Sequence, residues 1–325
     1  MQDIADRLNV SRSTVSLVLS GKAGSRVSEE VKEKVYRTAR ELNYHVNELA
    51  RSLRTGASRL IGVIVTDISN EFFGRLTFHI QEEAKKAGYL VLTANTNEDL
   101  RDFEETVRVL IGKQVDGIIA VPPPGSEETI AYIRDMGVPV VTLDRACEGL
   151  DVDYVGVDNY GAARAAVEGL LDDGFRRIAV VALDLDIPPL NERRNAYEDA
   201  MTSRGLQADI DIRLLPFGRE ATFDFSKITK GLREKDAVFF TSRRAFTYSM
   251  ANLAERRLDI AEGQCLLCFD DVQPYMTIHS HIRYVEQPVE AMGRKSFECL
   301  MDRIQGHPAP GRYLFTAKCV SNHKD

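Results

Sequence analysis

From position 60 onward, short runs of consecutive apolar residues alternate with longer stretches whose apolar residues have a helical spacing. A strand covered on both faces reads as a continuous apolar run, because neither direction of its side chains meets water. The runs fall into two series, 60–65, 89–94, 116–121 and 138–143, followed by 178–183, 237–241 and 265–269. Helices between the runs of the first series are expected over 75–87, 101–114 and 126–136. The alternation predicts two similar α/β lobes on parallel sheets, with a ligand cleft at the carboxyl ends of their strands.

The composition fits a cytoplasmic protein of two or three domains. The chain has 325 residues, of which 44% are hydrophobic, so it can bury a sizeable core. It has no run of about 18 apolar residues, and its start, MQDIADRLNV, lacks the apolar centre of a secretory signal. The five cysteines are odd in number and lie in apolar segments, which fits reduced thiols. We therefore expect a cytoplasmic location and no membrane association.

The sequence contains no pattern typical of catalysis or metal binding. Cys265 and Cys268 spell C-x-x-C, but residues three apart in a strand point to opposite faces, and no second pair lies at metal spacing. We find no G-x-G-x-x-G, no phosphate loop and no G-x-S-x-G elbow. We therefore expect neither an enzyme nor a protein with a cofactor or metal.

Charge is divided unevenly along the chain. The formal net charge is −7, yet the first 59 residues carry 11 Lys and Arg against 7 Asp and Glu. A basic head on an acidic body suggests that only the head meets an anionic partner such as nucleic acid. A surplus of this size is also compatible with an ordinary solvated surface.

Three short helices are predicted within the first 46 residues. Apolar positions 4, 5 and 8 share one face of the first helix. Ser11 is suited to cap a second helix, whose apolar positions 15, 18 and 19 recur at helical spacing and which Gly21 is placed to end. A third helix starts at Ser28, and its inward stripe runs from Val31 through positions 35 and 39 to Leu42. The first two helices would form a helix-turn-helix.

The second helix would present a polar face near its N-terminal end. In a helix-turn-helix unit this is the face that enters the major groove of DNA. Arginine can bond guanine or phosphate, hydroxyl groups can reach bases or phosphates, and a leucine can touch a thymine methyl. The alternative is a plain helical hairpin with a solvated, serine-rich face. The face comprises Ser11, Arg12, Ser13, Thr14, Ser16 and Leu17.

Three motifs near the N-terminus carry a resemblance to a known family. They are V-S-x-x-T-V-S, V-S-E-E and L-N-Y-x-x-N-x-x-A-R-S-L, and the last is followed closely by I-G-V-I-V. In this order and spacing they resemble the opening of lactose-repressor (LacI) family transcription factors, and a weaker resemblance extends through the whole chain. The resemblance implies a helix-turn-helix domain over 1–46, a hinge helix and linker over 47–59, and an effector-binding and dimerisation domain over 60–325.

The resemblance also implies a role for the segment 47–59. In the family this segment folds into a helix when two subunits of a homodimer sit on a pseudo-palindromic operator in double-stranded DNA. Its leucine then wedges into the minor groove, and the matching residue here is Leu53. Asn47 and Arg51 join it as DNA-binding candidates. A buried linker contact is the alternative reading of Leu53.

For the body, the resemblance implies two periplasmic-binding-protein-like lobes of type I. The chain would cross between them three times, near Asp158, near Gln287 and shortly before the C-terminus. One lobe would comprise about 60–158 and 287–316, and the other about 159–286 and 317–325. A small-molecule effector, a sugar or a sugar derivative, would bind between them.

Candidate effector-binding residues stand at predicted strand ends and at positions that match the family. Arg193 matches the family arginine that holds effector oxygens, and Asp270 matches the acid that takes effector hydroxyls. The segment 66-TDISNEFF-73 resembles the family's D-I-S-N-P-F-F. Strand-end acids can instead cap helices, and the phenylalanines can belong to the core. The candidates are Asp67, Asn70, Phe72, Phe73, Asp144, Arg193, Phe217, Arg243 and Asp270.

Two positions depart from the family's pattern. Leu17 stands where many members carry an arginine that reads a base, so the usual operator sequence is not assumed. Ser242 and Arg243 stand where an asparagine–aspartate pair is common. An arginine in place of the acid would favour an anionic effector, such as a sugar phosphate, over a neutral sugar. Alternatively, Arg243 faces solvent or pairs with an acid.

These observations predict a homodimeric, sequence-specific transcriptional repressor whose operator affinity is controlled by a small metabolite. An activator or a global regulator that uses a protein partner is a rival within regulation. A solute-binding protein is a rival from another class, and the helical head argues against it.

Overall fold

The structure, a computed structural model, describes residues 1–20, 23–44, 57–219, 222–255, 261, 263–276, 281–307 and 310–321. Its contacts divide the chain into two units, Met1–Ser58 and Arg59–Asp325. The described part of the first unit is helical, and the second unit is α/β.

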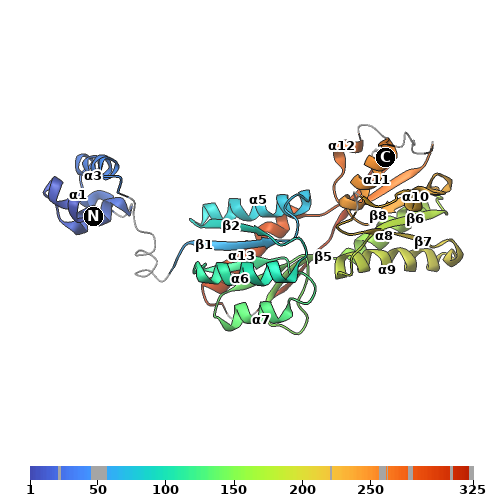
Figure 1. Ribbon diagram of the computed structural model, residues 1–325, viewed down its shortest axis with the longest axis horizontal. Helices are drawn as coiled ribbons and strands as arrows, with labels where there is room; N and C mark the ends of the chain where they lie inside the picture. The colour runs from blue at the N-terminus through green and yellow to red at the C-terminus, as the bar shows by residue number, and fades with distance from the viewer. Residues whose placement is uncertain are drawn as a thin grey trace. The chain divides into compact units, whose positions relative to one another are not determined.

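The first unit is a three-helix head made of α1 (Gln2–Leu8), α2 (Arg12–Leu19) and α3 (Glu29–Glu41) (Figure 1). Each helix buries one apolar face, and Ile4, Val15, Val18 and Val35 form the centre of the core. The backbone of Asn9 has a φ of 53°, which ends α1 and turns the chain toward α2. The helical spacing therefore decides the local structure here, and the three predicted helices are confirmed.

Leu42 is an exception to the inward stripe predicted for the third helix. Leu42 is 40% exposed. α3 ends at Glu41, and Leu42 occupies the cap position with a φ of −89° and a ψ of 7°, outside the helical register. The prediction for Leu42 was wrong because the helix stops one residue before it.

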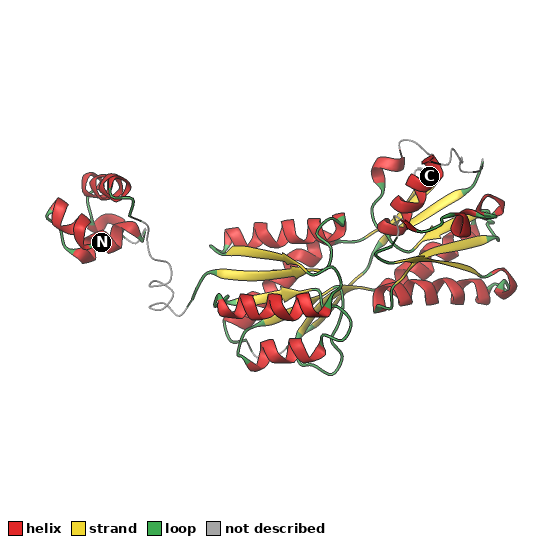
Figure 2. Ribbon diagram, in the orientation of Figure 1, coloured by secondary structure: helices red, strands yellow, loops and turns green. Residues whose placement is uncertain are grey.

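The second unit contains, among the described residues, two six-stranded sheets (Figure 2). In spatial order the first consists of β11 (Arg312–Phe315), β5 (Asp153–Val157), β4 (Val140–Leu143), β3 (Gly117–Ala120), β1 (Leu60–Val65) and β2 (Leu90–Asn95). The second consists of β12 (Lys318–Ser321), β10 (Ile282–Glu286), β9 (Cys265–Phe269), β8 (Ala237–Phe240), β6 (Ile178–Asp184) and β7 (Asp211–Pro216). Neighbouring strands run parallel, except that β12 is antiparallel to β10. We name the first sheet with its helices lobe 1, and the second lobe 2.

Helices cover both faces of each sheet, as Figure 2 shows. In lobe 1 one face carries α5 (Glu71–Lys86) and α13 (Val289–Ile304), and the other carries α6 (Leu100–Gly112) and α7 (Glu127–Asp135). In lobe 2 one face carries α8 (Asn159–Asp172) and α9 (Pro188–Ser203), and the other carries α10 (Ser226–Thr229), α11 (Arg243–Glu255) and α12 (Gln273–Met276). The chain passes between the lobes after β5, β10 and β11.

The strand β9 shows why these strands read as continuous apolar runs. Cys265, Leu267 and Phe269 belong to the core on one face of the sheet, while Leu266 and Cys268 belong to the core on the other. Both directions of the side chains are therefore buried, as expected for a parallel sheet between two helical layers. The two cysteines of the C-x-x-C motif point to opposite faces of the sheet, as predicted.

The edge strands β11 and β12 have no counterpart among the predicted runs. Exposed residues alternate with half-buried ones in β11, and in β12 only Val320 is half-buried. Short strands with so many exposed residues have no continuous apolar run by which to recognise them.

Candidate functional site

The first turn of α2 forms the exposed polar face of the head. Ser11 is the N-cap, and its hydroxyl oxygen accepts a hydrogen bond from the backbone N–H of Thr14 at 3.1 Å. The same oxygen lies 2.7 Å from the Ser13 hydroxyl and 2.8 Å from the Thr14 hydroxyl. Ser11, Arg12 and Ser13 are exposed, whereas Thr14 and Ser16 are half-buried. An exposed arginine and hydroxyl groups at a helix N-terminus form a suitable surface for a phosphate backbone.

Leu17 lies half-buried and packs against the core of the head. It therefore contributes to stability of the head as well as standing on the candidate face. The remaining DNA-binding candidates, Asn47, Arg51 and Leu53, lie outside the described residues.

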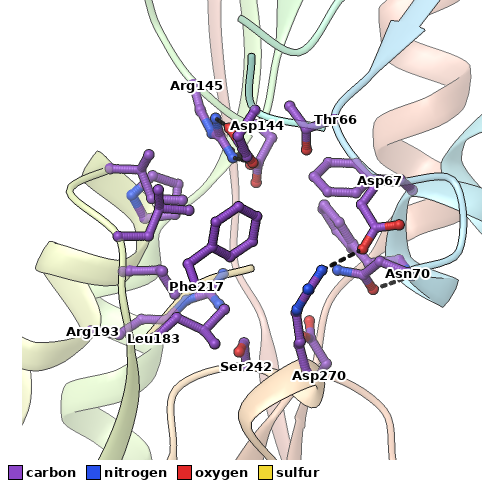
Figure 3. Close-up of a pocket in the computed structure, with 18 of the residues that line it drawn as sticks. Thr66, Asp67, Asn70, Asp144, Arg145, Leu183, Arg193, Phe217, Ser242 and Asp270 are labelled. Atoms are coloured by element: carbon purple, nitrogen blue, oxygen red, sulfur yellow. Dashed lines mark hydrogen bonds and ion pairs between the residues drawn. The ribbon is translucent and has the colours of Figure 1, made fainter. Parts of the chain in front are cut away.

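The second candidate site is a cavity between the two lobes, with about 580 Å³ of empty space including open solvent. Its walls come from the carboxyl ends of strands in both sheets. Thr66 follows β1, Asp144 follows β4, Phe217 follows β7 and Asp270 follows β9. Figure 3 shows Asp144 and Arg145 on one side, Asp67 and Asn70 on another, and Phe217 between them. The cleft predicted at the strand ends is present.

Eight of the nine effector-binding candidates line this cavity. They are Asp67, Asn70, Phe72, Phe73, Asp144, Arg193, Phe217 and Asp270. Asn70 also caps α5, since its side-chain oxygen accepts a hydrogen bond from the N–H of Phe72 at 3.1 Å. The rings of Phe72 and Phe73 meet edge to face with centroids 5.0 Å apart. Both phenylalanines are buried, so each is part of the core of lobe 1 as well as of the cavity wall.

Two cavity carboxylates, Asp144 and Asp270, are held in an unusual backbone conformation. Their φ angles are 67° and 108°, in a region that residues with side chains rarely adopt. Such positions cost of order 1–3 kcal/mol and cluster at binding sites, where the surrounding fold enforces them. Burial raises the pKa of both carboxyls, and Arg145 and Arg193 oppose the shift at Asp144. Asp144 and Asp270 are therefore buried carboxyls in the cavity wall, where each can form a hydrogen bond with a ligand hydroxyl.

Arg193 is fixed by bonds on the side away from the cavity. Its guanidinium donates to the side-chain oxygen of Asn159 at 2.9 and 2.7 Å and to the carbonyl of Thr241 at 2.8 Å. The ring of Phe269 lies 3.7 Å from the guanidinium carbon. Burial lowers the pKa of Arg193, while Asp270 and Asp144 oppose this. A guanidinium has five N–H donors, so this arrangement orients the rest toward the cavity that Arg193 lines.

Asp270 is held by one residue at the start of α11 and one at a crossing between the lobes. Its carboxylate accepts hydrogen bonds from the backbone N–H of Arg243 at 3.0 Å and from the side-chain amide of Gln287. Gln287 follows β10, at the point where the chain leaves lobe 2. The acid therefore sits beside one of the crossings between the lobes.

Arg145 and Glu98 form a buried ion pair in the wall of the cavity. Two guanidinium nitrogens of Arg145 donate to the two carboxylate oxygens of Glu98, each at 2.6 Å. Burial lowers the pKa of Arg145, and its bonds to Glu98 more than reverse this, so the net shift is upward. Glu98 stands in a turn with a φ of 63°. The pair adds a fixed, charge-balanced surface that the sequence did not predict.

Several buried polar atoms of the cavity walls have no hydrogen-bond partner among the described residues. They include Thr66 Oγ1, Arg145 Nε and Gln287 Oε1. Buried polar groups are normally paired, and each unpaired one costs about 1–3 kcal/mol. The Thr66 hydroxyl can donate to and accept from a bound molecule and Gln287 Oε1 can accept, whereas Arg145 Nε lies 3.6 Å from a carboxylate oxygen of Asp144. Together with Asp144, Asp270 and the aromatic rings, they suit a compact ligand rich in hydroxyl groups.

Arg243 differs from the other candidates, since it does not line the cavity. Its guanidinium pairs with Glu71 at 2.7 Å and donates to the carbonyl of Asp271. The neighbouring Arg244 lines the cavity instead and pairs with Asp67 at 3.0 Å. Arg243 is therefore engaged with an acid, the second reading of this residue from the sequence. Arg243 therefore gives no support to an anionic effector.

The sequence left several lining residues unrecognised. Arg145 directly follows Asp144, so its place at a strand end was a usable signal. Gln287 was noted only as a crossing point, and Glu98 lies in a turn without any motif. An apolar wall from lobe 2 was also not predicted, and it consists of Leu183, Leu185, Ile187, Pro189 and Leu190.

The described part of the chain was also compared with what a disulfide, a metal site or a membrane-spanning helix requires. All five cysteines are free; four are buried and Cys319 is exposed. No group of three His, Cys, Asp or Glu side chains among the described residues is placed to hold a metal ion. Within the same residues, no helix is long and apolar enough to cross a membrane.

Comparison with known proteins covers both units. Residues 1–47 match the family of bacterial regulatory proteins of the lacI type. Residues 61–231 match a periplasmic binding protein domain, and residues 167–319 match a periplasmic binding protein-like domain. A sucrose operon repressor of Pediococcus pentosaceus is 30% identical over 315 residues, which cover 94% of this chain and 92% of that repressor. The chain belongs to the LacI family.

Other relatives agree with this assignment. The ribose operon repressor of Escherichia coli K12 is 27% identical over 314 residues, covering 94% of this chain and 92% of that repressor. The crystal structure of the lac repressor dimer bound to operator and an anti-inducer aligns with a TM-score of 0.81 at 22% identity, covering 98% of this chain and 96% of that one. This LacI-family chain is a regulatory protein and not an enzyme, and its predicted fold class is confirmed.

Proposed function

We propose that this LacI-family protein is a transcriptional repressor that acts in the cytoplasm as a homodimer on a pseudo-palindromic operator. The polar first turn of α2, with exposed Arg12 and Ser13, would enter the major groove. Leu53, with Asn47 and Arg51, would act in the minor groove, as the resemblance implies. Relatives named as operon repressors support repression over activation.

The effector we propose is a neutral sugar bound in the cavity between the lobes. The observation that carries this is the set of buried wall atoms without a hydrogen-bond partner, together with the buried carboxyls of Asp144 and Asp270. Sugar hydroxyls both donate and accept, so they can satisfy Asp144, Asp270 and Thr66 at once, while Phe72 and Phe217 offer apolar faces. The named sugars of two relatives, sucrose and ribose, fit this chemical class.

Operator selection followed by mobility-shift titration would test both halves of the proposal. Operators are first selected from random DNA with the full chain, then titrated with and without D-ribose and sucrose. We expect one sugar to change operator affinity by about 5-fold to 150-fold, the usual range of allosteric coupling. In vitro transcription from a promoter that overlaps the operator should fall when the protein is added.

Two variants separate the sites. Arg12→Ala should lose operator binding but keep sugar binding, whereas Asp270→Ala should lose the sugar response but keep operator binding. Failure to select any DNA sequence would leave a solute-binding protein as the better reading. A rise in transcription would make the protein an activator.

A further inference from the structure

Three ion pairs join lobe 1 to lobe 2 beside the cavity. Arg243 pairs with Glu71 at 2.7 Å, Arg244 with Asp67 at 3.0 Å, and Arg75 with Asp271 at 3.1 Å. Each pair takes one member from the segment that starts α5 and the other from the ends of β8 or β9 in lobe 2.

The charges are arranged as two complementary rows. On lobe 1 the order is acid, acid, base, from Asp67 through Glu71 to Arg75, at intervals of four residues. Residues four apart on a helix stand on one face, so Glu71 and Arg75 both face lobe 2. On lobe 2 the consecutive arginines 243 and 244 meet the acids, and an acid meets the base. A shift of register between the rows would bring like charges together.

The rows are also connected to the cavity itself. Arg244 lines the cavity, and its guanidinium carbon lies 4.8 Å from the ring centre of Phe217. The backbone N–H of Arg243 binds Asp270, an acid of the cavity wall. Asp67, the partner of Arg244, lines the cavity from lobe 1. Separation of the lobes would therefore break ion pairs and open the cavity at the same time.

We propose that Arg243 and Arg244 are positioning residues that hold the two lobes closed over the effector through ion pairs to α5 and the turn before it. The proposal rests on the proposed function of the cavity, and it gives the departure at position 243 a role. The arginine serves closure of the cleft, not recognition of an anionic ligand. It follows that binding of an uncharged sugar to this protein weakens as ionic strength rises.

Hydrogen–deuterium exchange of the effector-free full chain tests closure without any ligand. The double variant Glu71→Gln/Arg75→Gln removes two of the three pairs from lobe 1 and leaves the net charge unchanged. We expect faster exchange in peptides from the first turns of α11, although no residue of lobe 2 has been altered. The matched control is Glu104→Gln/Arg108→Gln, which removes an exposed pair within α6 of lobe 1. Unchanged exchange in α11 of the first variant would overturn the proposal.

Isothermal titration with D-ribose or sucrose, whichever binds, tests the link to the effector. The Kd of the parent protein should rise about threefold to tenfold between about 50 and about 500 mM NaCl, because partly exposed ion pairs are weak singly and are screened by salt. In the Glu71→Gln/Arg75→Gln variant the Kd should be raised already at low salt and vary less than about twofold. The α6 control variant should behave like the parent.

The two proposals can fail separately. A salt-independent Kd that is equal in all three proteins would overturn the positioning role and leave the sugar site intact. Absence of binding by any sugar would contradict the proposed effector, and the exchange experiment would still decide whether the ion pairs hold the lobes together.

Discussion

Individual charged residues in this protein differ mainly in how far burial and partners constrain them. Arg193 and Asp270 are buried and bonded on their far sides, so each is held in one orientation toward the cavity. Their identity was predicted from the sequence because both stand in segments that match the family. Their orientation depends on Asn159 and Gln287, which come from distant parts of the chain and carry no motif. The partners therefore could not be predicted.

Replacement of Arg193 by lysine should separate the effect of its positive charge on sugar binding from the effect of its guanidinium geometry. Lysine keeps the positive charge but cannot reproduce the fork that binds Asn159 and Thr241. We expect affinity for the sugar effector to fall about 10-fold to 100-fold, which corresponds to loss of about 1.5–3 kcal/mol from a charged hydrogen bond. Isothermal titration measures the change, and Arg164→Lys on the surface of α8 is the control. Unaltered affinity would remove Arg193 from the site.

Asp211 gives a prediction for the pH dependence of stability. Hydrogen bonds from Arg213 and then Lys235, against an opposing effect of burial, lower the pKa of Asp211 to about 2 from its usual 3.8. Because the folded pKa is lowered, its stabilisation is present above about pH 4 and is lost as the pH falls toward 2. With allowance for solvent screening, we expect Asp211→Asn to cost about 1–2 kcal/mol of unfolding free energy at pH 7.

Urea unfolding at pH 7 and near pH 3 would check this prediction. The difference between the parent and Asp211→Asn should shrink at the lower pH. Asp172→Asn, which removes an exposed pair with Arg204, should have little effect at either pH. A difference that grows on acidification would contradict the assignment.

At the scale of elements, the helices follow from local signals more closely than the strands do. Ser11 begins α2 and Ser28 begins α3, as predicted from their cap positions. Most central strands follow from their continuous apolar runs, but the buried strand β5 was not predicted. The strands β7, β10, β11 and β12 were also not predicted. Each lies at or next to a sheet edge, and polar residues interrupt its apolar sequence.

The cap of α2 can be tested apart from DNA contact. Ser11→Ala removes the hydrogen bond to the N–H of Thr14 and should destabilise the head by about 1 kcal/mol. Ser11→Asn retains a capping oxygen and should be nearly neutral. Thermal unfolding followed by circular dichroism measures both. Equal loss in the two variants would mean that Ser11 stabilises the head by some other contact.

The crossing of α5 and α13 depends on a glycine. A Cβ added at Gly293 would lie 2.9 Å from the Cβ of His79 and 3.2 Å from the carbonyl oxygen of Leu76. The helices would have to move apart, so Gly293→Ala should cost about 1–3 kcal/mol. Gly169→Ala in α8 meets nothing within 4 Å and should instead stabilise by up to about 1 kcal/mol. Chemical denaturation would distinguish them, and a neutral Gly293→Ala would show that the crossing can relax.

At the scale of the whole molecule, regulation requires that binding of the effector changes the free energy of operator binding. The chain crosses between the lobes after β5, β10 and β11, and the cavity lies among residues that follow β9 and β10. A ligand there touches both lobes, so it can bind one arrangement of the lobes more tightly than another. Only such a difference in affinity can shift a conformational equilibrium.

Thermodynamic linkage gives a quantitative prediction for the intact protein. If the effector changes operator affinity by a given factor, operator DNA must change effector affinity by the same factor. Titration of the sugar into free protein and into the protein–operator complex measures the change in effector affinity. Mobility shift with and without the sugar measures the change in operator affinity. Unequal factors would indicate that the sugar also binds outside the cavity or that the oligomeric state changes.

The sequence by itself determined the class of each part of this protein. Periodicity decided helix against strand, because side-chain spacing reflects which faces are buried. The motifs at the N-terminus and at the strand ends identified the family and eight of the residues that line the cavity. Tertiary structure alone decided how Arg145 meets Glu98 and which arginine of the 243–244 pair reaches the cavity. Both depend on contacts between residues far apart in the chain and on the direction in which single side chains point at the ends of helices. Neither the contacts nor the directions leave a pattern in the local sequence. Arg243 and Arg244 therefore both pair with acids of lobe 1, and of the two only Arg244 also lines the cavity.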